Sequence, residues 1–298
     1  GDIIFHLLVA EETIKNLPQT LGGSSFIAGA GGQTYSPIQI LAASIPQPPE
    51  AELQDKRPSP LARTGEFAWH ALKEAQSRKS RPAQSYFAGY ITHLVADVNI
   101  HPYILARAGI YPHPHPLCWE HKKLEMSVDV ALLNHIRNIT PEHYPFADTL
   151  SRLNRLPPAV VNIYREIIWD LYGINLKPKL IHNAFTHTKT ALRIISKWEF
   201  LLTRIFPIIR RDFPTDLFLY RSYPIPEDPL NLSRRTWKHP INGKEISHTV
   251  LDIFHNTVKT STEIIREVLS SDTPPSLLRD NPSLDTGLLN TPLPLSST

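Results

Sequence analysis

Cysteine is almost absent from this chain of 298 residues, which holds only Cys118. A single cysteine forms no internal disulfide and supplies no cysteine-rich zinc site. Any metal ion must therefore be held by histidine, aspartate and glutamate side chains. The fold likewise depends on its core and not on covalent cross-links.

An excess of charge of one sign is also lacking. The 31 Lys and Arg residues nearly balance the 28 Asp and Glu residues, and the net charge is +3. This argues against a polyanion-binding tail, and we expect no nucleic-acid partner. No stretch approaches the roughly 18 consecutive apolar residues that cross a membrane, so we expect no transmembrane segment. The hydrophobic fraction of 41% is enough for a sizeable core.

Alternating strand patterns are scarce, whereas apolar residues recur at helical spacing along most of the chain. We predict an all-α fold, a bundle of about eight helices. The helical patterns cover residues 2–17, 61–79, 83–108, 119–137, 146–155, 157–172, 178–206 and 243–270.

Long proline-rich loops connect these predicted helices, since the chain holds 28 prolines. The longest loops are predicted at 33–60 and 207–241. We expect one all-α domain over residues 1–271. Residues 272–298, rich in proline and serine, are predicted to form an irregular or disordered tail.

The segment from Ser85 to Val98 is apolar almost all round, which is typical of a central, buried helix. It carries His93, Asp97 and His101 at steps of four residues, which places them on one stripe of the helix. Imidazole and carboxylate are the donors that zinc prefers where thiolates are absent. The alternative is a buried hydrogen bond between His93 and Asp97, with His101 capping the helix.

A second pair, His121 and Glu125, follows on the next predicted helix with the same spacing. Alone it would be a surface ion pair. His70 and His6 lie on two further predicted helices, where a lone histidine is ordinarily a packed core residue. Together these residues lie on four successive helices, and facing helices of a bundle build multinuclear metal sites in this way. A buried Asp97 also requires a partner or a metal ion.

The order His, His, His-x3-Asp-x3-His, His-x3-Glu resembles the zinc-dependent phospholipase C family of the bacterial type. Residues 86–103 are similar to the signature helix of that family, and His121 to Asp129 resembles its next helix. The resemblance covers roughly residues 2–135. It implies an all-α fold with two or three zinc ions that cleaves phospholipids on the diacylglycerol side of the phosphate.

The resemblance also implies a role for each residue. One zinc would be held by His70, His93 and Asp97. Asp97 would also bridge to a neighbouring ion, and we assign the catalytic role to it. His101, His121 and Glu125 would hold another zinc, and His6 would serve a third. A metal-activated water would attack a phospholipid or another small phosphodiester, with transient contact to a membrane surface.

One departure from the family pattern supports an alternative. The family has a ligating aspartate between the first two histidines, whereas the stretch from Phe26 to Tyr35 contains no carboxylate. The amide of Gln33 does not accept a proton as a carboxylate does. The alternative is a catalytically degenerate relative that binds metal or a lipid headgroup. A third hypothesis is a single-strand-type nuclease of the same fold, although its Gln-Pro-Leu-His and Gly-Gly-Asn motifs are missing.

Overall fold

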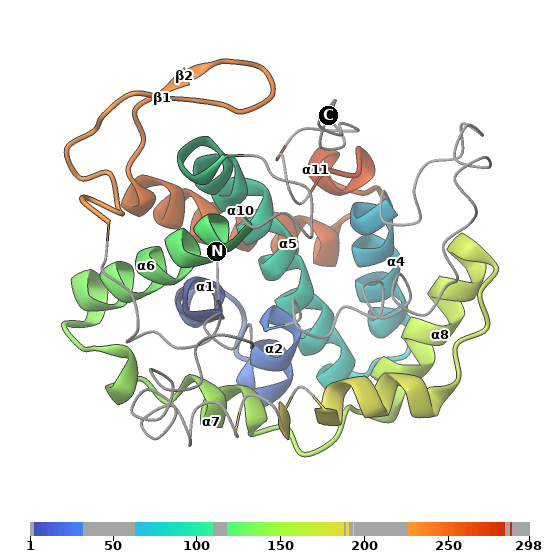
Figure 1. Ribbon diagram of the computed structural model, residues 1–298. Helices are drawn as coiled ribbons and strands as arrows, with labels where there is room; N and C mark the ends of the chain where they lie inside the picture. The colour runs from blue at the N-terminus through green and yellow to red at the C-terminus, as the bar shows by residue number, and fades with distance from the viewer. Residues whose placement is uncertain are drawn as a thin grey trace, which may run out of the picture.

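The computed structural model describes a chain that is mainly helical (Figure 1). The described residues are 3–31, 63–109, 118–187, 189–190, 193, 226–283 and 287. The longer helices are α1 (Ile3–Lys15), α2 (Gly23–Ala30), α4 (Thr64–Ser77), α5 (Arg81–Ala108), α6 (Cys118–Arg137), α8 (Pro158–Tyr172) and α10 (Val250–Ser270). Shorter ones are the 3-10 helix Pro141–His143, α7 (Phe146–Ser151) and α11 (Ser276–Arg279). This confirms the all-α prediction.

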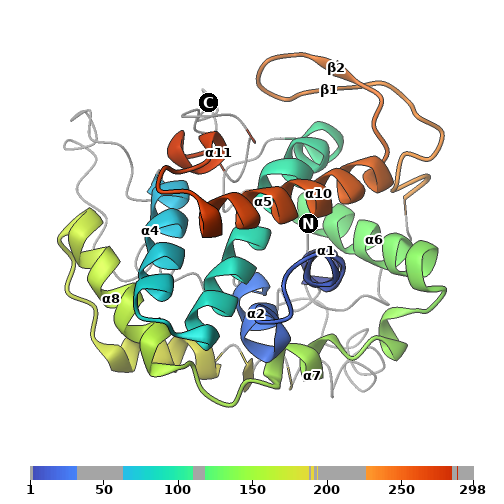
Figure 2. The ribbon, with the colours of Figure 1, turned by 180° about the vertical axis from the view of Figure 1, so that it is seen from behind.

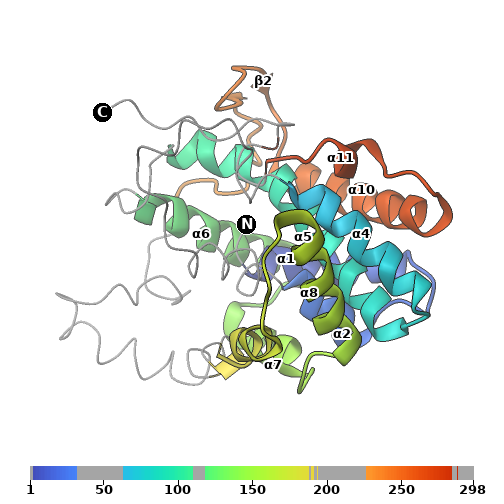
Figure 3. The same cartoon turned by 90° about the vertical axis from the view of Figure 1, so that its right-hand side faces the viewer.

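Helix α5 runs through the middle of the molecule (Figures 1 and 3). Its first turn is capped by Ser80, whose hydroxyl accepts from the amide of Ala83. Helices α1, α2, α4, α6, α8 and α10 all contact it, and α10 lies across it on the face seen in Figure 2. Almost every residue between Tyr86 and Leu105 is buried in consequence. The prediction of a central, buried helix is confirmed.

Two glycines allow α2 to approach α5 closely. A Cβ atom at Gly29 would lie 1.9 Å from the carbonyl oxygen of Tyr86, and one at Gly89 would lie 2.0 Å from that of Phe26. Both distances are far inside van der Waals contact, so larger residues at these positions would push the helices apart. The backbone of the short helix α2 therefore packs directly against the backbone of α5.

The expected helix over 243–270 begins later than predicted. Thr249 and Asp252 form a capping box, in which each side chain accepts from the other's amide, and α10 starts at Val250. The preceding residues pair instead, as β1 (Trp237–Lys238) and β2 (Glu245–Ile246) form a short antiparallel ribbon. Strand β1 lies inside the predicted loop 207–241.

The predicted irregular tail is also partly wrong. It contains the short helix α11, whose Leu278 is fully buried. Gly65 of α4 lets the two helices touch, because a Cβ atom there would lie 2.2 Å from the carbonyl oxygen of Leu278. Residues 178–187 are helical as expected. The predicted loop 33–60, Gln33 included, lies outside the described residues.

Within the described segments, no helix combines the length and the apolar character that crossing a membrane requires.

Candidate metal centre

The first cluster of donors, called group one below, consists of His6 on α1 and of His93 and Asp97 on α5. The Nε2 atom of His6 lies 3.1 Å from Oδ1 of Asp97, and that of His93 lies 3.1 Å from Oδ2. The two imidazole rings stack with their centroids 4.3 Å apart. All three side chains are buried, so one carboxylate is held between two imidazoles away from water.

The second cluster, called group two below, consists of His101 on α5 and of His121 and Glu125 on α6. The Nε2 atoms of His101 and His121 lie 3.3 Å and 3.4 Å from Oε1 of Glu125. The other oxygen of Glu125 lies 3.2 Å from Nζ of Lys122. Because Lys122 engages Oε2, the geometry leaves Oε1 as the atom that faces the two imidazoles.

Asp97 connects the two groups. Its Oδ1 atom, which faces His6, also lies 3.8 Å from Nε2 of His101. The step of four residues from His93 through Asp97 to His101 brings all three to the same side of α5. The two groups form one continuous cluster of six of the seven predicted residues, all of them buried except the half-buried His121.

The electrostatics of group one favour a cation. Burial acts to raise the pKa of Asp97, but His93, His101 and His6 outweigh it and hold that pKa well below its usual value. Burial lowers the pKa of His6 to about 4, and the neighbouring His93 adds to this effect. Near neutral pH, group one therefore presents an ionised carboxylate beside the neutral His6 ring, the protonation states that metal ligation requires.

Group two also contains a carboxylate with a lowered pKa. Burial acts to raise the pKa of Glu125, but Lys122 and the hydrogen bonds from its two histidines hold it well below the usual value. For His101, burial acts to lower the pKa, yet Asp97 and Glu125 outweigh it and raise the pKa. Two ionised carboxylates are thus buried within one cluster. Buried charges are costly unless they are paired or bind a metal ion.

The ring of His93 is oriented by a contact on its far side. Its Nδ1 atom lies 3.0 Å from the carbonyl oxygen of Ala30, at the last residue of α2. Since a carbonyl only accepts, Nδ1 carries the proton in this contact, and the ring is turned so that Nε2 faces Asp97. Metal-ligating histidines are ordinarily fixed in this way by a second hydrogen bond. No motif in the sequence points to Ala30.

Asp129 is another buried acid that sequence reasoning did not single out. Its carboxylate accepts from the amides of Ile4 and Phe5, at 2.9 Å and 3.0 Å. It lies one turn beyond Glu125 on α6 and is fully buried. The continued spacing of four residues from His121 through Glu125 was the available signal for it.

His70 does not join the cluster. Its side chain is exposed on α4 and belongs to neither group, so its expected place with His93 and Asp97 is wrong. The apolar residues of α4 turn inward, and these include Trp69 and Ala71 on either side of His70. That packing directs His70 outward. His6, expected at a separate third ion, takes the place beside His93 and Asp97.

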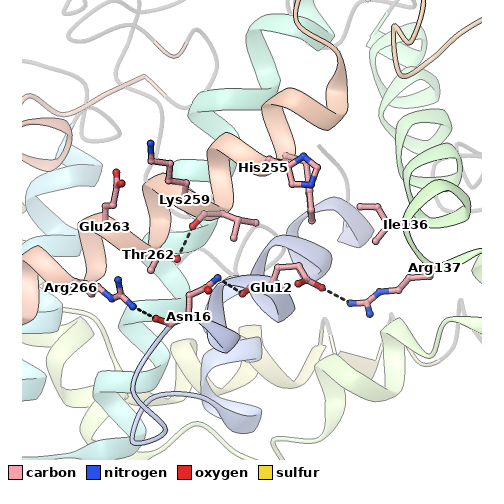
Figure 4. Close-up of a pocket in the computed structure, with 11 residues that line it drawn as sticks. Glu12, Asn16, Ile136, Arg137, His255, Lys259, Thr262, Glu263 and Arg266 are labelled. Carbon is pink, nitrogen blue, oxygen red and sulfur yellow. Dashed lines mark hydrogen bonds and ion pairs between the residues drawn. The ribbon is translucent and has the colours of Figure 1, made fainter.

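A separate pocket of about 600 Å³ lies between α1, α6 and α10, and no residue of either group lines it (Figure 4). Two of its basic side chains, Arg137 and Arg266, have internal partners. Arg137 pairs with Glu12, and Arg266 donates to the carbonyl oxygen of Asn16. The buried cluster is therefore the better candidate site.

The donor set fits a metal such as zinc, since it consists of imidazole nitrogens and carboxylate oxygens that converge in a buried place. Each group offers three donors from the described residues, which is the number that catalytic zinc sites take from the protein. Comparison of the chain with protein-family models, curated proteins and solved structures finds no match.

Proposed function

We propose that this protein is a zinc-dependent phosphodiester hydrolase, similar to phospholipase C. The observation that carries the proposal is the meeting of two groups of three donors at one carboxylate, that of Asp97. Hydrolases of phosphate esters commonly use two neighbouring metal ions that hold the phosphate between them. A carboxylate shared between the groups would hold two such ions close together.

The number of donors separates a catalytic from a structural role. Structural zinc sites are closed by four protein ligands, whereas catalytic sites keep a position for water or substrate. Groups one and two each offer three donors in the described part of the chain. The proposal therefore assigns an open position to each group.

The chain's own residues have distinct tasks. Asp97 supplies negative charge to both groups, and the Ala30 carbonyl keeps Nε2 of His93 directed at the cluster. Lys122 contacts Oε2 of Glu125, whereas Oε1 of the same carboxylate faces His101 and His121. When bound, zinc polarises a phosphoryl oxygen and makes water acidic enough to attack phosphorus near neutral pH.

The substrate class rests on the resemblance described above, which implies a phospholipid or a similar small phosphodiester. The net charge of +3 gives no support to a groove that tracks nucleic acid. The missing aspartate favours one other candidate, a relative that holds metal without turnover.

The test begins with the zinc content of the purified chain. We expect two or three zinc ions in the parent and their loss in His93→Ala/His121→Ala. His255→Ala, which removes an exposed histidine of α10, should keep them. The zinc-loaded parent should then hydrolyse a chromogenic phosphocholine ester and leave single-stranded DNA intact. Bound zinc without turnover of either substrate would favour the degenerate relative, and a parent without zinc would refute the proposal.

A further inference from the structure

Helix α1 is anchored at its beginning by a residue of α6. The first amides of a helix have no partner within it, and here both oxygens of Asp129 accept from Ile4 and Phe5. The carboxylate is 0% exposed, so water does not compete for these hydrogen bonds. A negative charge is also favourable beside the positive end of the helix dipole. Asp129 therefore ties the first turn of α1 to a defined point on α6.

The anchored turn is the one that carries a metal-site residue. His6 follows Phe5 directly, and its Nε2 atom reaches Asp97 at 3.1 Å. A shift of α1 along or about its axis would move His6 by the same amount. The hydrogen bonds to Asp129 are thus made at the point where they restrain His6 most directly.

The same face of α6 serves both groups of the site. His121, Glu125 and Asp129 follow one another at steps of four residues, so they lie along one stripe of the helix. Two of them belong to group two, and the third holds the helix that brings His6 to group one. The position of α6 consequently sets the geometry of both groups.

We propose that Asp129 is a positioning residue for the metal centre, which acts by holding His6 in place. This inference rests on the proposed metal-dependent function and adds a residue that neither the motif pattern nor the resemblance assigns. A cap that served folding alone would stabilise α1 without any particular effect on group one. The two roles differ in what they predict for metal affinity.

The test is a double-mutant cycle on zinc affinity, measured by competition with a chromophoric chelator. Its members are Asp129→Asn, His6→Ala and the double variant. We expect D129N to weaken one zinc site by about 10- to 100-fold, as is usual for residues that orient ligands. The site weakened should be the one that H6A weakens and not the one that His121→Ala weakens. Because Asp129 acts through His6, the double variant should bind zinc no more weakly than H6A.

Asp252→Asn is the matched control, since Asp252 also caps a helix with its carboxylate, but one that carries no residue of either group. It should lower stability without changing zinc affinity. Should D129N fail to fold, Asp129→Glu takes its place in the cycle. Glutamate keeps the carboxylate, but its additional methylene group moves both carboxylate oxygens.

A second measurement examines the anchor without metal. Hydrogen exchange at the amides of Ile4 and Phe5 should be faster in zinc-free D129N than in the parent. Zinc binding by D129N equal to that of the parent would overturn the positioning role alone. Equal weakening of both sites, or full additivity with H6A, would overturn it too. A parent that binds no zinc would refute the proposed function together with this inference.

Discussion

His93 is tied to α2 by the 3.0 Å contact between its Nδ1 atom and the carbonyl oxygen of Ala30. This contact depends on the close seating of α2 on α5, which Gly29 and Gly89 permit. The orientation of an imidazole in the candidate metal site is therefore linked to two glycines, Gly29 and Gly89. The link leads to a test by substitution.

Gly89→Ala should reduce both stability and zinc affinity. The added methyl group would meet the backbone of α2, which does not move aside as a flexible side chain would. We expect a loss of about 3 kcal/mol in the free energy of unfolding, measured by urea denaturation. Gly173→Ala is the control, because nothing lies within 4 Å of that position, and its left-handed backbone costs only about 1 kcal/mol. Equal losses in both variants would contradict the close-packing argument.

His70→Ala should leave the zinc content unchanged. The side chain is exposed on α4 and lies in neither group, although the resemblance implies that it is a ligand. Elemental analysis measures the zinc content of this variant, and His93→Ala is the comparison that should lose zinc. Loss of zinc from the His70 variant would mean that α4 turns toward the site when metal binds.

Asp97→Asn should affect both groups at once, because its carboxylate faces His6, His93 and His101. An amide keeps the shape but loses the charge and one acceptor atom. We expect the affinity for the more tightly bound zinc to fall by more than about 100-fold, since even residues behind the ligands contribute 10- to 100-fold. Isothermal titration of zinc into the parent and into D97N measures this loss. Asp170→Asn, an exposed change on α8, is the control and should keep the affinity of the parent. A single weakened site in D97N would show that the two groups are independent.

The metal-free protein should lose stability as the pH falls from about 6.5 to 4. The pKa of His6 is lowered to about 4 by burial, while the unfolded chain binds the same proton near 6.5. The unfolded state therefore holds more protons within this window, so stability decreases as the pH decreases. At about 1.4 kcal/mol for each pKa unit, the loss amounts to about 3 kcal/mol.

Urea denaturation in the presence of a chelator, across this range, measures that loss. His6→Gln, which does not titrate, is the reference. The parent should lose stability relative to H6Q between pH 6.5 and 4. Parallel curves would show that His6 titrates alike in the folded and unfolded states.

Local spacing was enough to predict much of this site. His93, Asp97 and His101 share a side of α5 because the pitch of a helix is the same wherever the helix lies. The same holds for His121 and Glu125 on α6. The apolar run around His93 likewise indicated burial, since such a surface is stable only away from water. The all-α class followed from the same periodicity.

The failures concern relations between helices. The resemblance assigned His70 to the site, and the packing of α4 against α5 decides that it faces outward. The position of His6 beside Asp97 depends on Asp129, more than 120 residues further along the chain. The close contact at Gly29 and Gly89 is equally non-local. Helical pitch places side chains within one segment, whereas packing and long-range hydrogen bonds place the segments, and these exist only once the chain has folded.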